Sequence, residues 1–276
     1  MSMIKMVGLD LDGTSLNEKS RLSPRTKAAF ERAGEMGVHI VVATGRTFSS
    51  LPEELKDVKG LKYLITSNGA KITGAQDGKT YYENLIGEKE TEKVHNILKP
   101  LNASIEFFAE GRAYIGMEDY EKVEKGFFRE EVRTYVLTTR TPVEDIYDFL
   151  LKNKGRIENI NVNFTELEEK PFFAKALSVL DGVTLTSSFP FNIEIGGKTT
   201  SKGEALAYLL KQEGLERENL MACGDNPNDI AMIKLAKIGV AMGNADEEVK
   251  KIADVIAPPN YEDGVAQMIE KYVFEE

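Results

Sequence analysis

The chain has 276 residues, of which 42% are apolar and 29% charged, a balance typical of a globular protein with a sizeable core. Its 45 acidic and 35 basic residues give a formal net charge of −10 without a long basic block, which argues against a nucleic-acid or anionic-membrane surface. One cysteine excludes an internal disulfide, and no run approaches the ~18 apolar residues that span a bilayer. Because the N-terminus also lacks the features of a signal peptide, we expect a cytoplasmic protein.

The first 70 residues alternate between strand and helix signals. A serine N-cap followed by proline, Ser23-Pro24, starts a helix that Gly37 ends. Residues 38–43 are almost all β-branched or apolar without alternation, as in a strand buried on both faces. A short helix is expected at 52–56. The strands predicted in this part of the chain are 4–9, 38–43 and 63–66.

The middle of the chain, from about residue 87 to residue 189, has a different pattern. Its strands alternate more clearly between polar and apolar residues, and its charge density is higher. Strands with one solvated face suggest a separate α+β module inserted into the chain. The expected strands are 105–109, 113–117, 160–164 and 183–187, and the expected helices are 90–98, 143–152 and 170–180.

The last 80 residues return to alternating strands and helices. Ser201 and Glu204 form a capping-box pattern that starts a helix, and we interpret the Gly-rich segment 196–200 before it as a loop. The expected strands are 220–223, 238–242 and 254–257, and the expected helices are 205–211, 230–236, 246–253 and 262–273. Such alternation is typical of a parallel sheet. We therefore predict an α/β fold with a Rossmann-like parallel-sheet core, residues 1–85 and 190–276, around an inserted α+β domain, residues 86–189.

Asp10 and Asp12 directly follow the first predicted strand. The carboxyl ends of the strands in an open parallel sheet border the crevice that binds ligands, so both carboxylates are expected there. Gly13 permits a sharp turn just after them. Two like charges this close are unfavourable unless a metal ion, another cation or a shared proton relieves them. A plain polar turn is the structural alternative, because Asp-Gly is a common turn signal.

Further residues, all polar except one glycine, end predicted strands or start predicted helices at the same edge. They are Thr44, Gly45, Arg46, Lys202, Asp225, Asn228 and Asp229. Each alone also fits a structural role, as a strand-end hydroxyl, an exposed first-turn lysine or a helix cap. Together with Asp10 and Asp12 they supply hard oxygen ligands suited to Mg²⁺ and the donors that a phosphoryl group needs, which indicates phosphoryl transfer.

These residues lie in four ordered motifs that resemble the haloacid dehalogenase-like superfamily, specifically its Cof-type sugar-phosphatase branch. The motifs are Asp10-Leu11-Asp12-Gly13-Thr14, Ala43-Thr44-Gly45-Arg46, Ser201-Lys202-Gly203-Glu204-Ala205-Leu206 and Gly224-Asp225-Asn226-Pro227-Asn228-Asp229. Softer matches lie at 66–70, 240–245 and 262–266. The resemblance covers nearly the whole chain outside the middle module, and it implies that this module is an α/β cap domain.

The resemblance also implies a role for each candidate residue. Asp10 would be the nucleophile that becomes an aspartyl phosphate, and Asp12 the general acid and then the general base. Asp10, the carbonyl of Asp12, and Asp225 would hold Mg²⁺. Asp229 would orient Lys202 or a group on the metal. The residues implied to bind the phosphoryl group or the rest of the substrate are Thr44, Gly45, Arg46, Lys202 and Asn228.

The expected function is therefore Mg²⁺-dependent hydrolysis of small phosphomonoesters, such as sugar phosphates or related metabolites. One alternative is a phosphotransferase or mutase that passes the phosphoryl group to another hydroxyl. A receiver-like signalling domain and a catalytically idle metabolite-binding regulator are further alternatives. The expected partner is a small phosphorylated metabolite, with no nucleic acid and no membrane, and the chain is expected to be a monomer or a small homo-oligomer.

Overall fold

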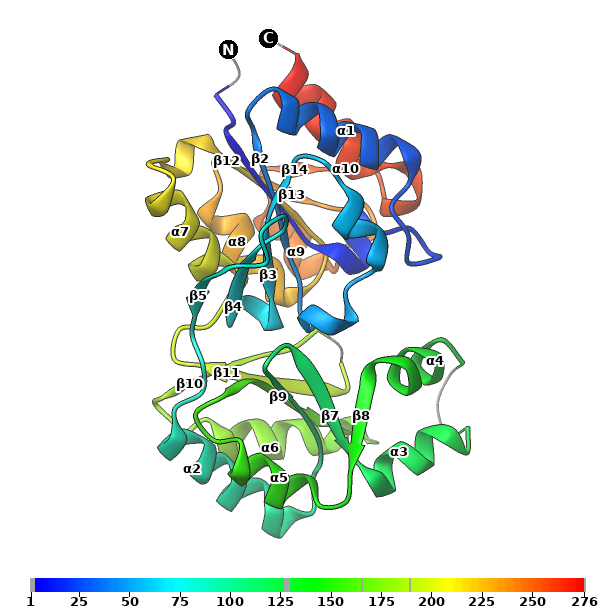
Figure 1. Ribbon diagram of the computed structural model, residues 1–276, viewed down its shortest axis with the longest axis vertical. Coiled ribbons are helices and arrows are strands. Elements are labelled where there is room, and N and C mark those ends of the chain that lie inside the picture. The colour runs from blue at the N-terminus through cyan, green and yellow to red at the C-terminus, as the bar shows by residue number, and fades with distance from the viewer. Residues whose placement is uncertain (1–2, 127–129, 165, 189, 276) are drawn as a thin grey trace. The chain divides into compact units, whose positions relative to one another are not determined.

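The structure is a computed structural model that describes residues 3–126, 130–164, 166–188 and 190–275. The chain divides into two compact units, whose elements are labelled in Figure 1. Unit 1 comprises residues Met1–Gly45, Pro52–Glu83 and Ser201–Glu276, and unit 2 comprises Arg46–Leu51 and Asn84–Thr200. Unit 1 is thus assembled from three separate segments of the chain.

Unit 1 is built on an eight-stranded sheet with the order β14-β13-β12-β1-β2-β3-β4-β5. The strands from β14 to β3 run parallel, and β4 and β5 add an antiparallel hairpin at one edge. The strands are β1 (Met6–Leu9), β2 (His39–Ala43), β3 (Leu61–Thr66), β4 (Lys71–Gly74), β5 (Thr80–Glu83), β12 (Leu220–Gly224), β13 (Ile238–Ala241) and β14 (Val255–Ile256). Every residue of β1 and β12 is buried, as expected of strands covered on both faces.

The helices of unit 1 cover this sheet. They are α1 (Pro24–Glu35), α7 (Lys202–Gln212), α8 (Ile230–Leu235), α9 (Glu247–Ile252) and α10 (Gly264–Ile269). Helix α1 packs beside α10, and α7 packs beside α8 (Figure 1). The Ser23 hydroxyl caps α1 by accepting a hydrogen bond from the Thr26 N–H at 3.0 Å, as the sequence predicts.

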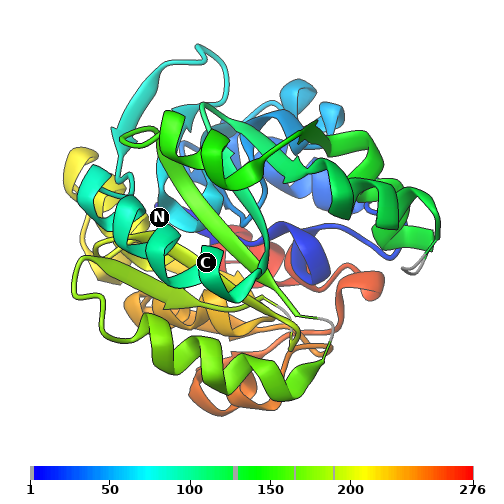
Figure 2. The ribbon, with the colours of Figure 1, turned by 90° about the horizontal axis from the view of Figure 1, so that it is seen from below.

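Unit 2 contains a six-stranded sheet with the order β10-β11-β9-β6-β7-β8. Neighbouring strands are antiparallel except for β7 and β8. The strands are β6 (Ser104–Ala109), β7 (Arg112–Gly116), β8 (Arg140–Val143), β9 (Ile157–Asn163), β10 (Val183–Thr186) and β11 (Asn192–Gly197). The helices are α2 (Glu88–Leu98), α3 (Met117–Glu124), α4 (Glu130–Thr139), α5 (Ile146–Lys152) and α6 (Lys170–Leu177). Figure 2 shows α2, α5 and α6 on one face of the sheet, where Val94, Leu150 and Leu177 join its apolar core.

The predicted α/β fold, with its parallel core sheet and inserted α+β module, is confirmed. One prediction within it is wrong, because Gly196 and Gly197 lie in strand β11 and not in a loop. These glycines have a packing reason. A Cβ atom on Gly197 would lie only 2.7 Å from the carbonyl oxygen of Leu85 and 2.8 Å from that of Asn84. Glycine here therefore allows two backbone segments to approach each other closely.

Other differences concern element bounds and short elements. Helix α5 begins at Ile146 and not at residue 143, because the Asp145 carboxylate caps it and accepts hydrogen bonds from the N–H groups of Tyr147 and Asp148, both at 2.9 Å. The β4–β5 hairpin, strand β8 and helices α3 and α4 are not predicted from the sequence.

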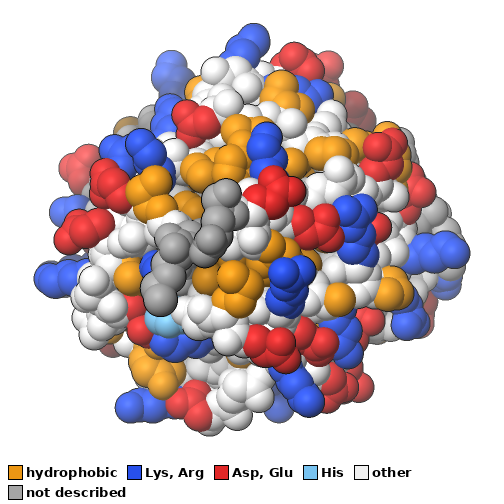
Figure 3. All heavy atoms as spheres, turned by 90° about the horizontal axis from the view of Figure 1, so that it is seen from above, with side chains coloured by type: hydrophobic (Ala, Val, Ile, Leu, Met, Phe, Trp, Pro, Cys, Tyr) orange, Lys and Arg blue, Asp and Glu red, His pale blue; other side chains and the backbone are white. Residues whose placement is uncertain are grey.

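The surface of unit 1 carries charges of both signs. Lys and Arg side chains are interspersed with Asp and Glu over the face that Figure 3 shows, with apolar side chains between them. This face therefore presents no uniform field of one sign of the kind that attracts a polyanion. In the part of the chain that the structure describes, no helix is both long enough and apolar enough to cross a membrane.

Candidate active site

The candidate site begins where three neighbouring strands of unit 1 end. Leu9, the last residue of β1, pairs with Val42 of β2 on one side and with Cys223 of β12 on the other. The Asp10 N–H continues this ladder by donating to the Cys223 carbonyl at 3.1 Å. The residues that follow these strands therefore meet at the carboxyl edge of the sheet, where open α/β sheets bind ligands.

A tight turn at residues 11–15 follows Asp10 and contacts the Asp225 side chain. Gly13 lies in it with φ +79°, and a Cβ atom at this position would overlap the Asp225 carboxylate. The Thr14 hydroxyl donates to Asp225 Oδ1 at 2.7 Å, and the Ser15 hydroxyl donates to the Asp10 carbonyl at 2.5 Å. The position thus requires glycine both for its left-handed backbone and for the space that Asp225 occupies.

Lys202 is the first residue of α7 and is almost completely buried, with 1% of its surface exposed. The Ser201 hydroxyl caps this helix by accepting from the Glu204 N–H at 3.0 Å, as the capping-box pattern predicts. Lys202 Nζ lies 2.6 Å from Asp10 Oδ1 and 2.6 Å from Asp229 Oδ1. The ammonium therefore joins two carboxylates that are far apart in the sequence.

Asp229 is held by both of its carboxylate oxygens. Oδ1 receives the Lys202 ammonium, and Oδ2 accepts from the backbone N–H groups of Asp225 at 2.9 Å and of Asn226 at 3.0 Å. The side chain is completely buried, and a Cβ atom on Gly224 would overlap it. This geometry suits Asp229 for holding Lys202 in place, while its neighbour Asp225 accepts from the neutral groups of Thr14 and Asn226.

The carboxylates of Asp10, Asp225 and Asp229 form a buried cluster in which one oxygen of each lies within 4.8 Å of the others. Burial raises the pKa of Asp10 well above its ordinary value, although Lys202 opposes this effect. Burial, followed by the charge of Asp229, raises the pKa of Asp225 to about 7. Burial lowers the pKa of Lys202, but Asp10 and Asp229 outweigh it and raise the pKa. If all three carboxylates are ionised, a single ammonium leaves excess negative charge, which burial makes unfavourable and which raises the pKa of Asp10 and Asp225.

A divalent cation fits this donor set. Carboxylate oxygens are hard ligands of the type that Mg²⁺ prefers, and a cation would offset the charge that burial makes unfavourable. Since both Asp229 oxygens already hold Lys202 and two backbone N–H groups, Asp10 and Asp225 are the carboxylates best suited to a metal.

A pair of amides extends the site toward β3. Asn228 Nδ2 donates to Asn68 Oδ1 at 3.1 Å, and Asn68 lies two residues after the end of β3 with a left-handed backbone, φ 58°. Asn68 Nδ2 and Asn228 Oδ1 are buried and have no hydrogen-bond partner among the residues that the structure describes. A Cβ atom on Gly45 would lie 3.1 Å from Asn68 Oδ1. The amide pair therefore has unused hydrogen-bonding capacity next to Gly45.

The remaining candidates lie in different surroundings. Thr44 is buried at the end of β2, where its N–H donates to the Ile65 carbonyl at 2.9 Å. Asp12 is exposed in the turn after β1. Arg46 belongs to unit 2, where its guanidinium donates to the Ser50 carbonyl at 3.1 Å and lies 5.1 Å from the centre of the Tyr135 ring. The structure thus groups Arg46 with unit 2 and the other candidates with unit 1.

Two residues of the site have no role in the sequence reasoning. They are Thr14, which orients Asp225, and Asn68, which pairs with Asn228. A signal for each is present in the sequence. Thr14 belongs to the motif at 10–14, and Asn68 lies two residues after the predicted strand 63–66.

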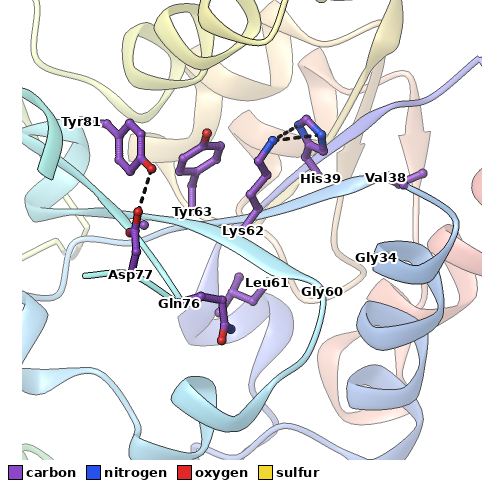
Figure 4. Close-up of a pocket in the computed structure, with 12 residues that line it drawn as sticks. Gly34, Val38, His39, Gly60, Leu61, Lys62, Tyr63, Gln76, Asp77 and Tyr81 are labelled. Atoms are coloured by element: carbon purple, nitrogen blue, oxygen red, sulfur yellow. Dashed lines mark hydrogen bonds between the residues drawn. The ribbon is translucent and has the colours of Figure 1, made fainter. Parts of the chain in front are cut away.

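A separate pocket of about 490 Å³ lies where β2 and β3 begin, at the ends opposite to the acidic cluster (Figure 4). In it Lys62 Nζ lies 3.1 Å from His39 Nε2 and 2.8 Å from Glu213 Oε2. The Tyr63 hydroxyl donates to Glu213 Oε1 at 2.5 Å. This network connects the start of the two strands to the end of α7, and none of the candidate site residues lines the pocket.

Known proteins resemble this chain over nearly its whole length. A family model described as haloacid dehalogenase-like hydrolase matches residues 7–269. The chain is 33% identical over 273 residues to 5-amino-6-(5-phospho-D-ribitylamino)uracil phosphatase YcsE of Bacillus subtilis, covering 98% of this chain and 96% of that protein. It is 31% identical over 282 residues to phosphatase YwpJ of the same organism, covering 96% of this chain and 99% of that protein.

Solved structures give the same result. A haloacid dehalogenase-like hydrolase from B. subtilis matches with a TM-score of 0.84 and 28% identity, covering 97% of this chain and 99% of that chain. The subclass IIB sugar phosphatase BT4131 matches with a TM-score of 0.81 and 26% identity, covering 97% of this chain and 98% of that chain. Since the family model and the relatives all span nearly the whole sequence, the chain belongs to the haloacid dehalogenase-like hydrolase family.

Proposed function

We propose that the protein is a Mg²⁺-dependent phosphatase that hydrolyses small phosphomonoesters through an aspartyl phosphate on Asp10. The observation that carries this proposal is the position of the Asp10 carboxylate, which follows β1 at the carboxyl edge of the sheet and is held 2.6 Å from the buried Lys202 ammonium. A carboxylate fixed in this way is oriented for attack on an electrophile. The ammonium stabilises negative charge on the group that the carboxylate attacks.

Asp10 and Asp12 divide the reaction into two steps. In the first, an Asp10 carboxylate oxygen bonds to phosphorus, the bond from phosphorus to the leaving oxygen breaks, and Asp12 donates a proton to that oxygen. In the second, Asp12 takes a proton from water, the water oxygen bonds to phosphorus, and the bond to Asp10 breaks. The exposed position of Asp12 in the turn after β1 supports this role, because the group must exchange protons with leaving group and water.

We propose that Asp10, the backbone carbonyl of Asp12, and Asp225 hold the metal. When bound, Mg²⁺ neutralises negative charge and thereby reduces the repulsion between a carboxylate and a phosphate. Asp229 keeps the Lys202 ammonium next to Asp10, and Thr14 orients the Asp225 carboxylate. These are positioning roles, since both side chains act through a neighbour.

The phosphoryl oxygens need hydrogen-bond donors, which Thr44, Gly45, Lys202 and Asn228 supply in this proposal. The unused capacity of the Asn68–Asn228 pair next to Gly45 supports a bound polar group there. For Arg46 we propose contact with the rest of the substrate.

We propose that the inserted domain, residues 86–189 in the sequence prediction, acts as a cap that excludes water and selects the leaving group. The substrate class, sugar phosphates or related metabolites, is supported by the names of relatives that act on a phosphoribityl compound and of a subclass IIB sugar phosphatase.

The test is a phosphate-release assay over sugar, nucleotide and vitamin phosphates with and without Mg²⁺. We expect release from sugar phosphates that requires Mg²⁺. Asp10→Asn should reduce this release by at least about a thousandfold, because the amide cannot act as the nucleophile. The circular dichroism spectrum of that variant should remain unchanged.

Two results would overturn the proposal. Phosphate release that Asp10→Asn retains would remove Asp10 as the nucleophile. Transfer of the phosphoryl group to a second sugar hydroxyl in place of water, measured as phosphorylated acceptor without free phosphate, would identify a phosphotransferase or mutase.

A further inference from the structure

The turn at residues 11–15, which contains Asp12, has glycine at its centre. Gly13 adopts φ +79°, and glycine has more backbone freedom than any other residue, so it keeps one conformation only where contacts restrain it. The Leu16 N–H closes the turn by donating to the Leu11 carbonyl at 2.9 Å. Contacts to the other backbone groups of the turn therefore affect where Asp12 lies.

Two asparagines, Asn244 and Asn260, contact this turn from outside and are here called the asparagine bridge. Asn244 Nδ2 donates to the Gly13 carbonyl at 2.8 Å, and Asn260 Nδ2 donates to the Leu16 carbonyl at 2.8 Å. The two asparagines are also joined to each other, because the Asn260 N–H donates to Asn244 Oδ1 at 3.0 Å. A chain of three hydrogen bonds thus connects Gly13 to Leu16 through residues more than two hundred positions later.

The segment that carries Asn244 is itself attached to the acidic cluster. It follows β13, and the Asp246 N–H donates to the Asp225 carbonyl at 2.9 Å. A Cβ atom on Gly243 would lie only 2.9 Å from Pro259 N, so glycine there allows the segments of the two asparagines to approach each other closely. The asparagine bridge is thus anchored beside Asp225 and extends from there to the turn.

A comparable asparagine lies at the opposite end of the sheet from the candidate site. Asn219, just before β12, donates from Nδ2 to the Met3 carbonyl at 3.0 Å and accepts at Oδ1 from the Glu216 N–H at 3.1 Å. Like Asn244, it joins a carbonyl and an N–H group from separate segments. Hydrogen bonds of this kind stabilise local structure wherever they occur, so Asn244 differs from Asn219 in the turn that it contacts.

We propose that the asparagine bridge positions Asp12 for proton donation to the leaving oxygen, because it fixes the Gly13 carbonyl next to that residue. This inference rests on the proposed function, in which Asp12 is the general acid. A proton donor must lie within hydrogen-bonding distance of the oxygen that it protonates, so a turn with several conformations slows this step. Asn244 and Asn260 are positioning residues, since they act through the backbone of the turn.

The leaving group distinguishes this role from a general loss of the site. A sugar alkoxide needs a proton to leave, whereas p-nitrophenolate is stable without one. The ratio kcat/KM covers the steps up to departure of the leaving group and excludes the later hydrolysis of the aspartyl phosphate. A misplaced Asp12 should therefore lower kcat/KM mainly for the sugar phosphate, whereas a misplaced nucleophile or metal should lower it for both substrates.

The experiment compares Asn244→Ala with Asn219→Ala, the matched control, which removes the same number of side-chain hydrogen bonds. The substrates are p-nitrophenyl phosphate and the sugar phosphate that the unchanged chain hydrolyses fastest. A second measurement needs no turnover. It is amide hydrogen exchange, followed by mass spectrometry on peptides that cover residues 11–16, where the Leu16 N–H reports opening of the turn.

We expect Asn244→Ala to lower kcat/KM about a hundredfold for the sugar phosphate and less than about tenfold for p-nitrophenyl phosphate. Exchange over residues 11–16 should become at least about fivefold faster. Asn219→Ala should change neither measurement. Asn260→Ala should act in the same direction as Asn244→Ala, and the double variant should lose less than the product of the two single losses, because both residues belong to one bridge.

Three outcomes would overturn the inference. Asn244→Ala lowers kcat/KM equally for both substrates, or exchange over residues 11–16 stays as in the unchanged chain, or Asn219→Ala gives the same losses. Failure of the proposed function is recognised separately, before any asparagine is changed. In that case the unchanged chain releases no phosphate from any substrate, or Asp10→Asn retains the release.

Discussion

Replacing Lys202 with methionine removes the ammonium from the acidic cluster while keeping a side chain of similar length. In the structure Lys202 Nζ lies 2.6 Å from both Asp10 and Asp229, and all three groups are buried. A hydrogen bond to a charged group contributes about 1.5–3 kcal/mol, and breaking a buried ion pair from one side costs about 3–5 kcal/mol. Because the variant leaves Asp10, Asp225 and Asp229 without a cation, we expect a loss of about 3–5 kcal/mol in the free energy of unfolding.

The assay is urea unfolding followed by circular dichroism, with a chelator present so that no metal replaces the missing charge. Lys62→Met is the matched control, because the Lys62 side chain is 37% exposed and pairs with Glu213 at 2.8 Å. Solvent screens such a pair, so its loss should cost less than about 1 kcal/mol. If Lys202→Met unfolds within about 1 kcal/mol of Lys62→Met, the buried contacts of Lys202 are not those that hold the cluster together.

Two further variants test local features of unit 1. Gly13→Ala should lower the free energy of unfolding by about 1–2 kcal/mol, because alanine disfavours the left-handed backbone, and by an additional amount because its Cβ atom overlaps Asp225. Gly37→Ala is the control: Gly37 also has a left-handed backbone, φ +78°, but open space around it, so this variant should lose only the backbone contribution. Equal urea midpoints for the two variants would contradict the overlap at Gly13. Burial, followed by Lys62, lowers the pKa of His39 below 6.5. The unfolded chain therefore binds more protons there, so stability from this group is present above pH 6.5 and is lost as the pH falls toward the folded pKa. Urea midpoints at pH 7.5 and 5.5 should differ less in His39→Gln than in the unchanged chain, and an equal difference would refute this explanation.

The parallel core could be predicted from the sequence because its signals are local. Apolar runs without alternation indicate strands buried on both faces, and β1, β2 and β12 lie where residues 4–9, 38–43 and 220–223 predict strands. Asp10 and Asp225 each follow one of these strands, so the sheet brings them together as expected. The roles assigned to the candidate residues stay predictions until the variants are measured.

Other features depend on contacts that no local pattern encodes. The glycines of β11 suggest a loop by composition, but their reason is the backbone of residues 84–85 beside them. The pairing of Thr14 with Asp225 joins residues 211 positions apart, and that of Asn68 with Asn228 joins residues 160 apart. Arg46 follows Thr44 in the sequence yet belongs to unit 2. The domain bounds predicted from composition remain a prediction.

The pairing of β1 with both β2 and β12 has a consequence for synthesis on the ribosome. Met6 pairs with His39 on one side and with Leu220 on the other, so one edge of β1 stays unpaired until more than two hundred residues have followed it. Residues 84–200, by contrast, form one continuous stretch of unit 2 and precede β12. Long-range strand pairing of this kind is slow, and an unpaired edge invites association with other chains. During most of its translation the polypeptide therefore has a sheet with one unpaired edge at β1. That edge is paired only when β12, in the last quarter of the chain, has been synthesised.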